Sequence, residues 1–163
     1  FLYIIAGKTI DQQYRAELEA AIVAMDGKVV YAGQISQNDV RLLYARSTLF
    51  MLAATYEKGD IEGFGLVITE SGGQGCPAIS TRVGGIADAV LDGKTGLLYD
   101  ENDIDGMAQG IRQILTDKPY RDQLGQAAKA YAASLTWERN ARLTLEGVLK
   151  SVAYIAVPLL QML

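Results

Sequence analysis

Two glutamates in the stretch IEGFGLVITE, residues 61 to 70, enclose a glycine-rich turn. Gly63 and Gly65 permit backbone angles closed to other residues and let a ligand approach the main chain closely. The residues that follow have the spacing of a buried helix, and free amide groups at a helix N-terminus attract an anion such as phosphate. Because a carboxylate beside phosphate would be repelled, Glu62 and Glu70 are expected to face sugar hydroxyls. The stretch therefore predicts a nucleotide-sugar site.

Taken singly, each carboxylate also has a plain structural interpretation. Glu62 alone would be an exposed loop residue, and Glu70 alone would be a solvated helix residue. The glycines at 72, 73 and 75 are expected to be turn residues that end the helix. Gly84 and Gly85, at the start of a later short helix, are a further candidate for the phosphate side of the site.

Three other features have structural rather than chemical interpretations. The sequence AGKT at 6 to 9 imitates the end of a phosphate loop, but that motif requires glycine where Leu2 stands. Cys76 is expected to be a small core residue, because no base is available to activate its thiol. Trp137 is expected to anchor the final helix in the core.

Composition excludes several classes of protein. The chain of 163 residues has no histidine, which removes histidine-based triads, histidine general bases and His-Cys zinc sites. A net charge of −4 without a basic run argues against a nucleic-acid partner. One cysteine allows no intrachain disulfide, so a reducing compartment, the cytoplasm, is the simplest expectation.

Apolar runs that read as strands alternate with segments of helical periodicity. This order predicts one α/β, Rossmann-like domain, a mostly parallel sheet flanked by helices. Ser36 and Thr136 are expected to cap helices. The expected strands are 1–6, 28–32, 48–54, 77–81 and 97–100, and the expected helices are 10–25, 36–46, one after Gly65, 84–91, 103–116, 119–134 and one from 136.

The two ends of the chain suggest a longer protein. The sequence lacks an initiating methionine and opens inside what reads as a buried strand, so we expect it to be a piece of something larger. Residues 1–150 would form the domain, and 151–163 an apolar, helical C-terminal tail that packs on further protein. That tail is too short for a transmembrane helix, which needs about 20 residues.

Three separate stretches carry a resemblance to one family. Glu62 and Glu70 with GFGLVIT between them resemble the E-x7-E signature of retaining glycosyltransferases with the GT-B fold, in the group 1 or family 4-like set. TRVGGIADAVLDGKTGLLYD at 81–100 and SLTWERNARLTLEGVL at 134–149 are similar to later parts of the same family. The resemblance implies the C-terminal, donor-binding half of a hexosyltransferase, with retention of configuration at the transferred sugar.

The resemblance also implies roles for individual residues. Glu62 would be the catalytic carboxylate that meets hydroxyls of the transferred sugar, and Glu70 would bind the ribose. The main chain around Gly63 and Gly65 would hold sugar and diphosphate, together with the residues between and after them, which are Phe64, Leu66 and Val67. Gln34 and Ile35, after the second strand, would meet the base.

Partners and cofactors follow from the same resemblance. The substrate would be a UDP-, GDP- or ADP-sugar, with no metal ion required, and the acceptor would bind a missing N-terminal domain, so this chain alone should be inactive. Peripheral association of the full-length protein with the inner face of the membrane is a further expectation. Two alternatives stay open: a non-catalytic nucleotide or sugar-binding module, and a glycoside hydrolase with two carboxylates.

Overall fold

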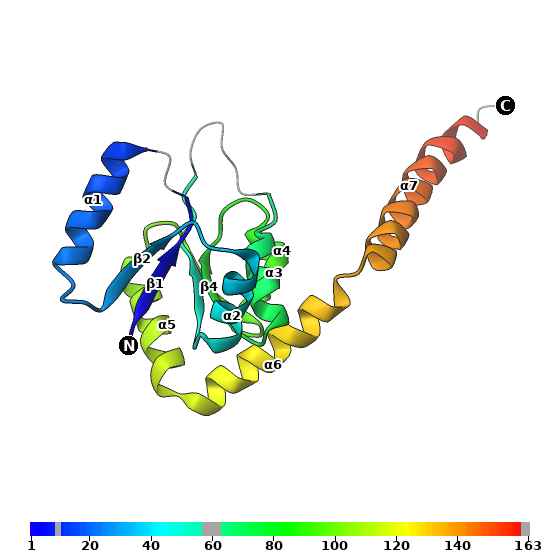
Figure 1. Ribbon diagram of the computed structural model, residues 1–163. Coiled ribbons are helices and arrows are strands. Elements are labelled where there is room, and N and C mark those ends of the chain that lie inside the picture. The colour runs from blue at the N-terminus through cyan, green and yellow to red at the C-terminus, as the bar shows by residue number, and fades with distance from the viewer. Residues whose placement is uncertain (9–10, 57–62, 161–163) are drawn as a thin grey trace. The chain divides into compact units, whose positions relative to one another are not determined.

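The structure is a computed structural model that describes residues 1–8, 11–56 and 63–160, with side chains described as far as residue 151. The chain divides into two units, Phe1–Leu43 and Tyr44–Leu163, which are described in turn. Figure 1 shows their elements along the chain, from blue at the N-terminus to red at the C-terminus.

The first unit alternates strands and helices, as the sequence predicts. Asp11 caps the first helix, because its carboxylate accepts a 2.8 Å hydrogen bond from the Tyr14 amide. Ser36 caps the second, since its hydroxyl accepts from the Asp39 amide at 3.2 Å. The elements are β1 (Tyr3–Ala6), α1 (Gln12–Val23), β2 (Val29–Gly33) and the beginning of α2 (Gln37–Arg46).

The first strand differs from its prediction as a buried run. β1 pairs in parallel with β2, and its register runs from Tyr3 opposite Val29 to Ala6 opposite Gly33. Ile4 and Ile5 are half-buried, whereas the two ends of the strand are exposed. A two-stranded sheet with α1 as its accompanying helix has little surface to bury within this unit, so the apolar run here is only partly covered.

The second unit is built around a parallel sheet of three strands in the order β3-β4-β5. β3 and β4 are shorter than predicted and fall inside their predicted ranges, whereas β5 has the predicted length but begins one residue earlier. The elements are β3 (Phe50–Leu52), α3 (Leu66–Gly73), β4 (Ala78–Thr81), α4 (Ile86–Ala89), β5 (Gly96–Tyr99), α5 (Ile104–Thr116), α6 (Lys118–Ser134) and α7 (Trp137–Leu160).

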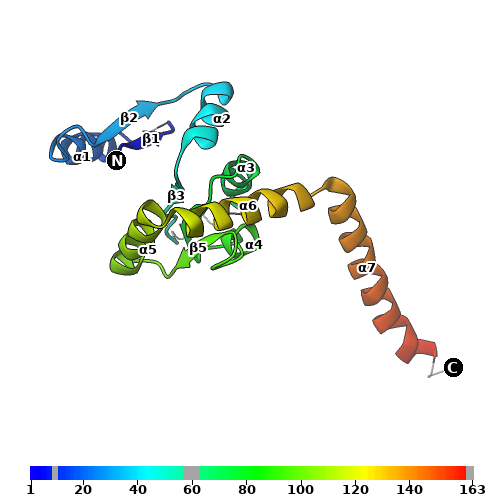
Figure 2. The same cartoon turned by 90° about the horizontal axis from the view of Figure 1, so that it is seen from below.

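Helices cover both faces of this sheet. Alternate residues of β4 point to opposite faces, so Ala78 packs with Ile68 and Ile86 on the side of α3 and α4. Ile79, which is fully buried, packs with Ile114 of α5 on the other side. In Figure 2, α6 begins next to α5 and runs along to α3, against which it packs. The prediction of a parallel α/β fold is confirmed.

Two predictions about the C-terminal half are wrong. Gly72 and Gly73 are not turn residues, because they are the last two residues of α3, and Gly72 is buried against Ala128 of α6. Gly75 does lie in the turn after the helix, with φ 79°. Trp137 is not a core anchor, because it is 85% exposed at the first position of α7. Thr136 does cap that helix, through a 3.2 Å hydrogen bond from the Arg139 amide.

In the part of the chain that the structure describes, no helix is long and apolar enough to cross a membrane.

Candidate functional site

The chain enters α3 through a left-handed residue. Gly65, at the N-cap position, has φ 71° and ψ 50°, a conformation that residues with side chains rarely adopt. Its carbonyl accepts a 2.8 Å hydrogen bond from the Ile68 amide, and no side chain in the described part of the chain caps the helix. Among the described residues no acceptor is found for the amides of Leu66 and Val67. With respect to the described residues, the N-terminus of α3 therefore presents amide donors without acceptors.

One side chain of this turn packs into the core, and two others are exposed to solvent. Phe64 is half-buried and packs against the core cluster that contains Ile68 and Val83. Leu66 and Val67, in contrast, are 66% and 38% exposed. Because the aromatic side chain points into the core, the turn can offer a ligand its main chain but not the Phe64 ring.

A second glycine lies directly against this turn. A Cβ placed on Gly85 would come within 1.9 Å of the Gly63 carbonyl oxygen and 3.4 Å of the Phe64 Cα. Gly84 and Gly85 do precede a short helix, α4, as predicted. The space beside Gly85 is occupied by main chain rather than open to a phosphate.

Glu70 lies on α3, one turn after Gly65, and its side chain is exposed. Its charge reaches Tyr44, a buried residue of α2 that meets Phe50 edge to face at 5.4 Å between ring centroids. Burial chiefly raises the pKa of the Tyr44 phenol, and the negative charge of Glu70 adds to the rise. Glu62, the other carboxylate of the predicted pair, lies outside the described residues.

The residues predicted to meet the base belong to the first unit. Gln34 and Ile35 follow β2 directly, after Gly33, whose φ of 64° turns the chain out of the strand. Gln34 is exposed and Ile35 is half-buried. The Gly33 carbonyl accepts a 2.9 Å hydrogen bond from the Gly7 amide, which joins the carboxyl ends of β1 and β2. A contact of these residues with a base stays a prediction.

The cysteine has no chemical role in this geometry. Cys76 is 2% exposed, and burial raises the pKa of its thiol to about 12. It therefore stays protonated at neutral pH and is a core residue, as expected.

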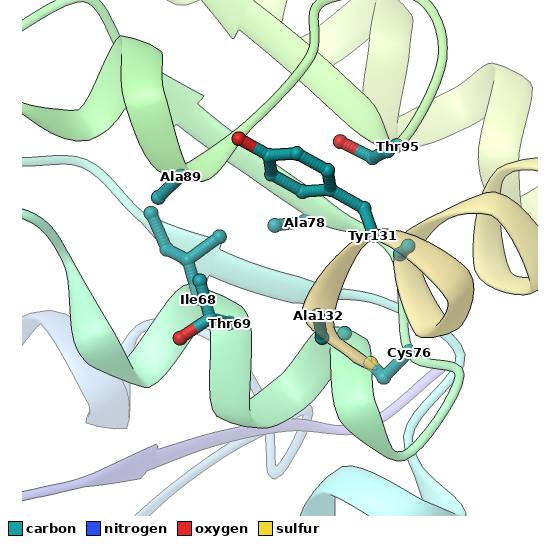
Figure 3. Close-up of a pocket in the computed structure, with 10 residues that line it drawn as sticks. Ile68, Thr69, Cys76, Ala78, Ala89, Thr95, Tyr131 and Ala132 are labelled. Carbon is teal, nitrogen blue, oxygen red and sulfur yellow. The ribbon is translucent and has the colours of Figure 1, made fainter. Parts of the chain in front are cut away.

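Beside Cys76, α3 and α6 leave a cavity of about 10 Å³, with Tyr131, Thr95 and Thr69 among its lining residues, as Figure 3 shows. Such a volume holds about one water molecule. None of the residues predicted to bind the donor lines it, so it is not the predicted site. In the described ranges, no group of three or more acidic or cysteine side chains could hold a metal ion. The metal requirement of the protein stays a prediction.

Sequence reasoning missed one contact near the site. The Glu101 carboxylate, in the turn after β5, accepts a 3.1 Å hydrogen bond from the Tyr56 amide. Tyr56 is the last described residue before the gap that precedes Gly63. The two partners are 45 positions apart, so no spacing in the sequence could indicate the bond. Its effect is to hold the main chain that leads away from β3.

Arg82, a cation at the carboxyl edge of the sheet, already has hydrogen-bond partners within the protein. Arg82, immediately after β4, donates to the Asp92 carboxylate at 2.5 Å and to the Leu98 carbonyl at 3.3 Å. Asp92 also accepts from the Leu98 amide at 2.9 Å. Burial of Asp92 opposes ionisation, but the hydrogen bonds from Leu98 and Arg82 outweigh it and lower the pKa of the carboxyl group. Arg82 thus serves the turn before β5.

The sequence matches the model of one protein family, glycosyl transferases group 1, over residues 1–131. The chain belongs to this family. A D-inositol 3-phosphate glycosyltransferase from Corynebacterium diphtheriae is 39% identical over 113 residues, which are 65% of this chain and 26% of that protein. The chain spans about a quarter of the length of the curated relatives it matches.

Solved structures of glycosyltransferases have the same fold. HepE from Anabaena, crystallised with UDP and glucose, superposes with a TM-score of 0.76 at 23% identity, over 92% of this chain and 40% of that one. The C-terminal domain of the group 1 family protein LpcC from Francisella tularensis superposes with a TM-score of 0.66 at 21% identity, over 77% of this chain and 63% of that one. The fold of this group 1 chain is therefore that of the C-terminal half of GT-B glycosyltransferases.

Proposed function

We propose that this chain is the donor-binding domain of a glycosyltransferase that moves a hexose from a nucleoside diphosphate sugar to an acceptor. The observation that carries the proposal is the N-terminus of α3 behind left-handed Gly65, where no described residue caps the helix or accepts from the amides of Leu66 and Val67. These donors suit a diphosphate leaving group, which they would stabilise as it departs. Family membership supports the same chemistry.

Within this proposal the two glutamates have separate tasks. Glu70, exposed on α3, would accept hydrogen bonds from the ribose hydroxyls. Glu62 would accept from hydroxyls of the sugar that is transferred, as the E-x7-E pattern suggests. We further propose that the reaction retains the configuration of the sugar and requires no metal ion.

The rest of the proposed enzyme lies outside this chain. The relatives are longer, which supports a missing N-terminal domain that binds the acceptor, with residues 1–150 as the donor domain and 151–163 as a tail that packs on further protein. We propose that the 163-residue chain alone has no transfer activity and that the protein works in the cytoplasm, at the inner face of the membrane in its full-length form.

Nucleotide binding is the first test. UDP is the first probe, because the HepE structure contains it; GDP and ADP are run in parallel. A nucleotide at about 100 times its Kd should stabilise the full-length protein by about 2.7 kcal/mol. If none of the three raises the melting temperature at millimolar concentration, the donor site is wrong.

A transfer assay tests the chemistry. Full-length protein should consume the matching nucleotide sugar in the presence of acceptor, and NMR of the product should show the anomeric configuration of the donor. Binding without transfer would favour the non-catalytic module. Release of sugar from an oligosaccharide without nucleotide would favour the hydrolase.

A further inference from the structure

Gly85 lies so close to the turn at Gly63 that there is no space for a side chain, although its backbone angles do not require glycine. Gly85 has φ −85° and ψ 9°, the angles of the third residue of a type I turn, a position that residues with side chains also occupy. The conformation therefore does not demand glycine at this position. What demands it is space, because a Cβ would lie 1.9 Å from the Gly63 carbonyl oxygen.

The side of the contact that carries Gly85 is firmly held. Ile86, next to Gly85, is completely buried, and Ala89 and Val90 are 4% and 2% exposed. The Tyr131 hydroxyl donates a 2.7 Å hydrogen bond to the Asp88 carbonyl, which ties this short helix to α6. Moving α4 would therefore open the core, and the loss of core contacts is strongly destabilising.

The other side of the contact is packed less tightly. Gly63 is exposed, and a Cβ placed on it would meet no atom within 4 Å. A methyl group on Gly85 needs about 3.0 Å from the oxygen, so the two atoms must separate by about 1.1 Å. Since α4 resists, the displacement falls on the Gly63 carbonyl, two residues before the N-cap of α3.

We propose that Gly85 is a positioning residue for the donor site: its missing side chain seats the Gly63 carbonyl and so fixes the direction of the Leu66 and Val67 amides. The inference rests on the proposed function but adds a residue that itself touches no substrate. Misplacement by about 1 Å is enough to cost up to about a hundredfold in function where donors must be aligned.

The chain offers a matched control. Gly125, buried in the middle of α6, faces a similar limit, because a Cβ there would lie 2.3 Å from the Gly75 carbonyl oxygen. Gly75 follows the C-terminal end of α3, whereas Gly63 precedes its N-terminal end. Gly85→Ala and Gly125→Ala thus add the same methyl group against the same kind of atom at opposite ends of one helix.

The test compares these two variants in the full-length protein, with UDP as the probe and calorimetry for its Kd. Gly85→Ala should raise the Kd for UDP at least tenfold, whereas Gly125→Ala should change it less than twofold while lowering the unfolding temperature. With ¹⁵N-glycine labelling, Gly85→Ala should also shift the amide resonances of Gly63 and Gly65.

Each contrary result has a separate meaning. UDP affinity equal to the parent in Gly85→Ala, or equal losses in both variants, would overturn the positioning role and leave the proposed function standing. Failure of Gly85→Ala to fold would also overturn it, because the core and not the exposed turn would then have taken the displacement. A parent protein that does not bind UDP, GDP or ADP would refute the proposed function and this inference with it.

Discussion

At each end of α3 a glycine allows two main-chain segments to come into close contact, but the two ends differ in exposure and in capping. At the N-terminal end Gly63 is exposed, and no side chain of the described residues caps the helix. At the C-terminal end Gly72 is buried, and the Ala128 carbonyl would be 3.3 Å from a Cβ on it. Packing therefore closes one end of the helix, while the other end is left with free donors.

The difference shows why the glycines of one stretch cannot all be given the same role. Glycine permits an unusual backbone angle at Gly65, where φ is 71°, but at Gly72 and Gly85 the angles are ordinary and the gain is close approach. Only the first case opens donors to a ligand. The comparison predicts that substitutions near the N-terminal end of α3 change the affinity for UDP, whereas substitutions at its C-terminal end change the unfolding free energy.

The largest expected effect is on nucleotide affinity, at Glu70 in the middle of α3. Glu70→Ala removes a charged acceptor, and hydrogen bonds to charged groups contribute about 1.5–3 kcal/mol. The Kd for UDP should therefore rise by about 10 to 100 times, with the unfolding free energy changed by less than about 0.5 kcal/mol. Isothermal calorimetry and thermal unfolding of the full-length protein measure the two quantities. Glu146→Ala, an exposed carboxylate of α7, is the control, and unchanged UDP affinity in Glu70→Ala would refute the ribose role.

At the opposite end, Gly125→Ala should act on stability. The added methyl group overlaps the Gly75 carbonyl inside packed helices, and overpacking of this kind costs about 1–3 kcal/mol. Chemical denaturation with urea should show a lower midpoint with an unchanged slope. If Gly125→Ala loses UDP binding but keeps its stability, the proposed difference between the two ends of α3 is wrong.

A smaller effect tests whether the ends are independent. Tyr131→Phe removes the 2.7 Å hydrogen bond from α6 to the Asp88 carbonyl of α4, the helix that follows Gly85. The loss should lower the unfolding free energy by about 0.5–1.5 kcal/mol. The Kd for UDP should stay within twofold of the parent, because the apolar contacts of Ile86 still hold α4. A tenfold loss of affinity would show that α6 controls the donor end as well.

The smallest effect is expected at Gly72. In Gly72→Ala the new Cβ would be 3.3 Å from the Ala128 carbonyl and 3.4 Å from its Cβ, which is tight but requires shifts of only a few tenths of an ångström. Alanine gains about 1 kcal/mol of helix propensity over glycine, which offsets that cost. The unfolding free energy should therefore change by less than about 0.5 kcal/mol. A decrease of more than about 2 kcal/mol in the unfolding free energy, measured by urea denaturation, would mean that α3 and α6 cannot move apart enough to accept the methyl group.

Local signals in the sequence predicted most of the fold. Alternating apolar runs gave the parallel α/β arrangement, and Ser36 and Thr136 cap the helices that they were expected to cap. Such features depend on residues within four positions of one another. The reach of the strands was overestimated, because Leu49 and Ala54 flank β3 and pack against the core without belonging to the strand.

The site could be predicted only in part. The free N-terminus of α3 follows from the glycines and from the helix that comes after them. The seat provided by Gly85 and the bond from Tyr56 to Glu101 join segments 22 and 45 positions apart, and a single sequence gives no signal for such contacts. Trp137 was misjudged for a related reason, since its exposure depends on what packs against α7 and not on its residue type.

Burial of the one cysteine of this chain has a practical consequence for labelling. With a pKa of about 12, the Cys76 thiol is ionised to less than roughly one part in ten thousand at pH 7.5, and it is shielded from reagents as well. A cysteine introduced at an exposed site such as Ser151 would therefore take up a maleimide fluorophore alone within this chain. A second cysteine introduced in the first unit would complete a dye pair, and the distance between the two dyes could then report how the two units are arranged when a nucleotide is added.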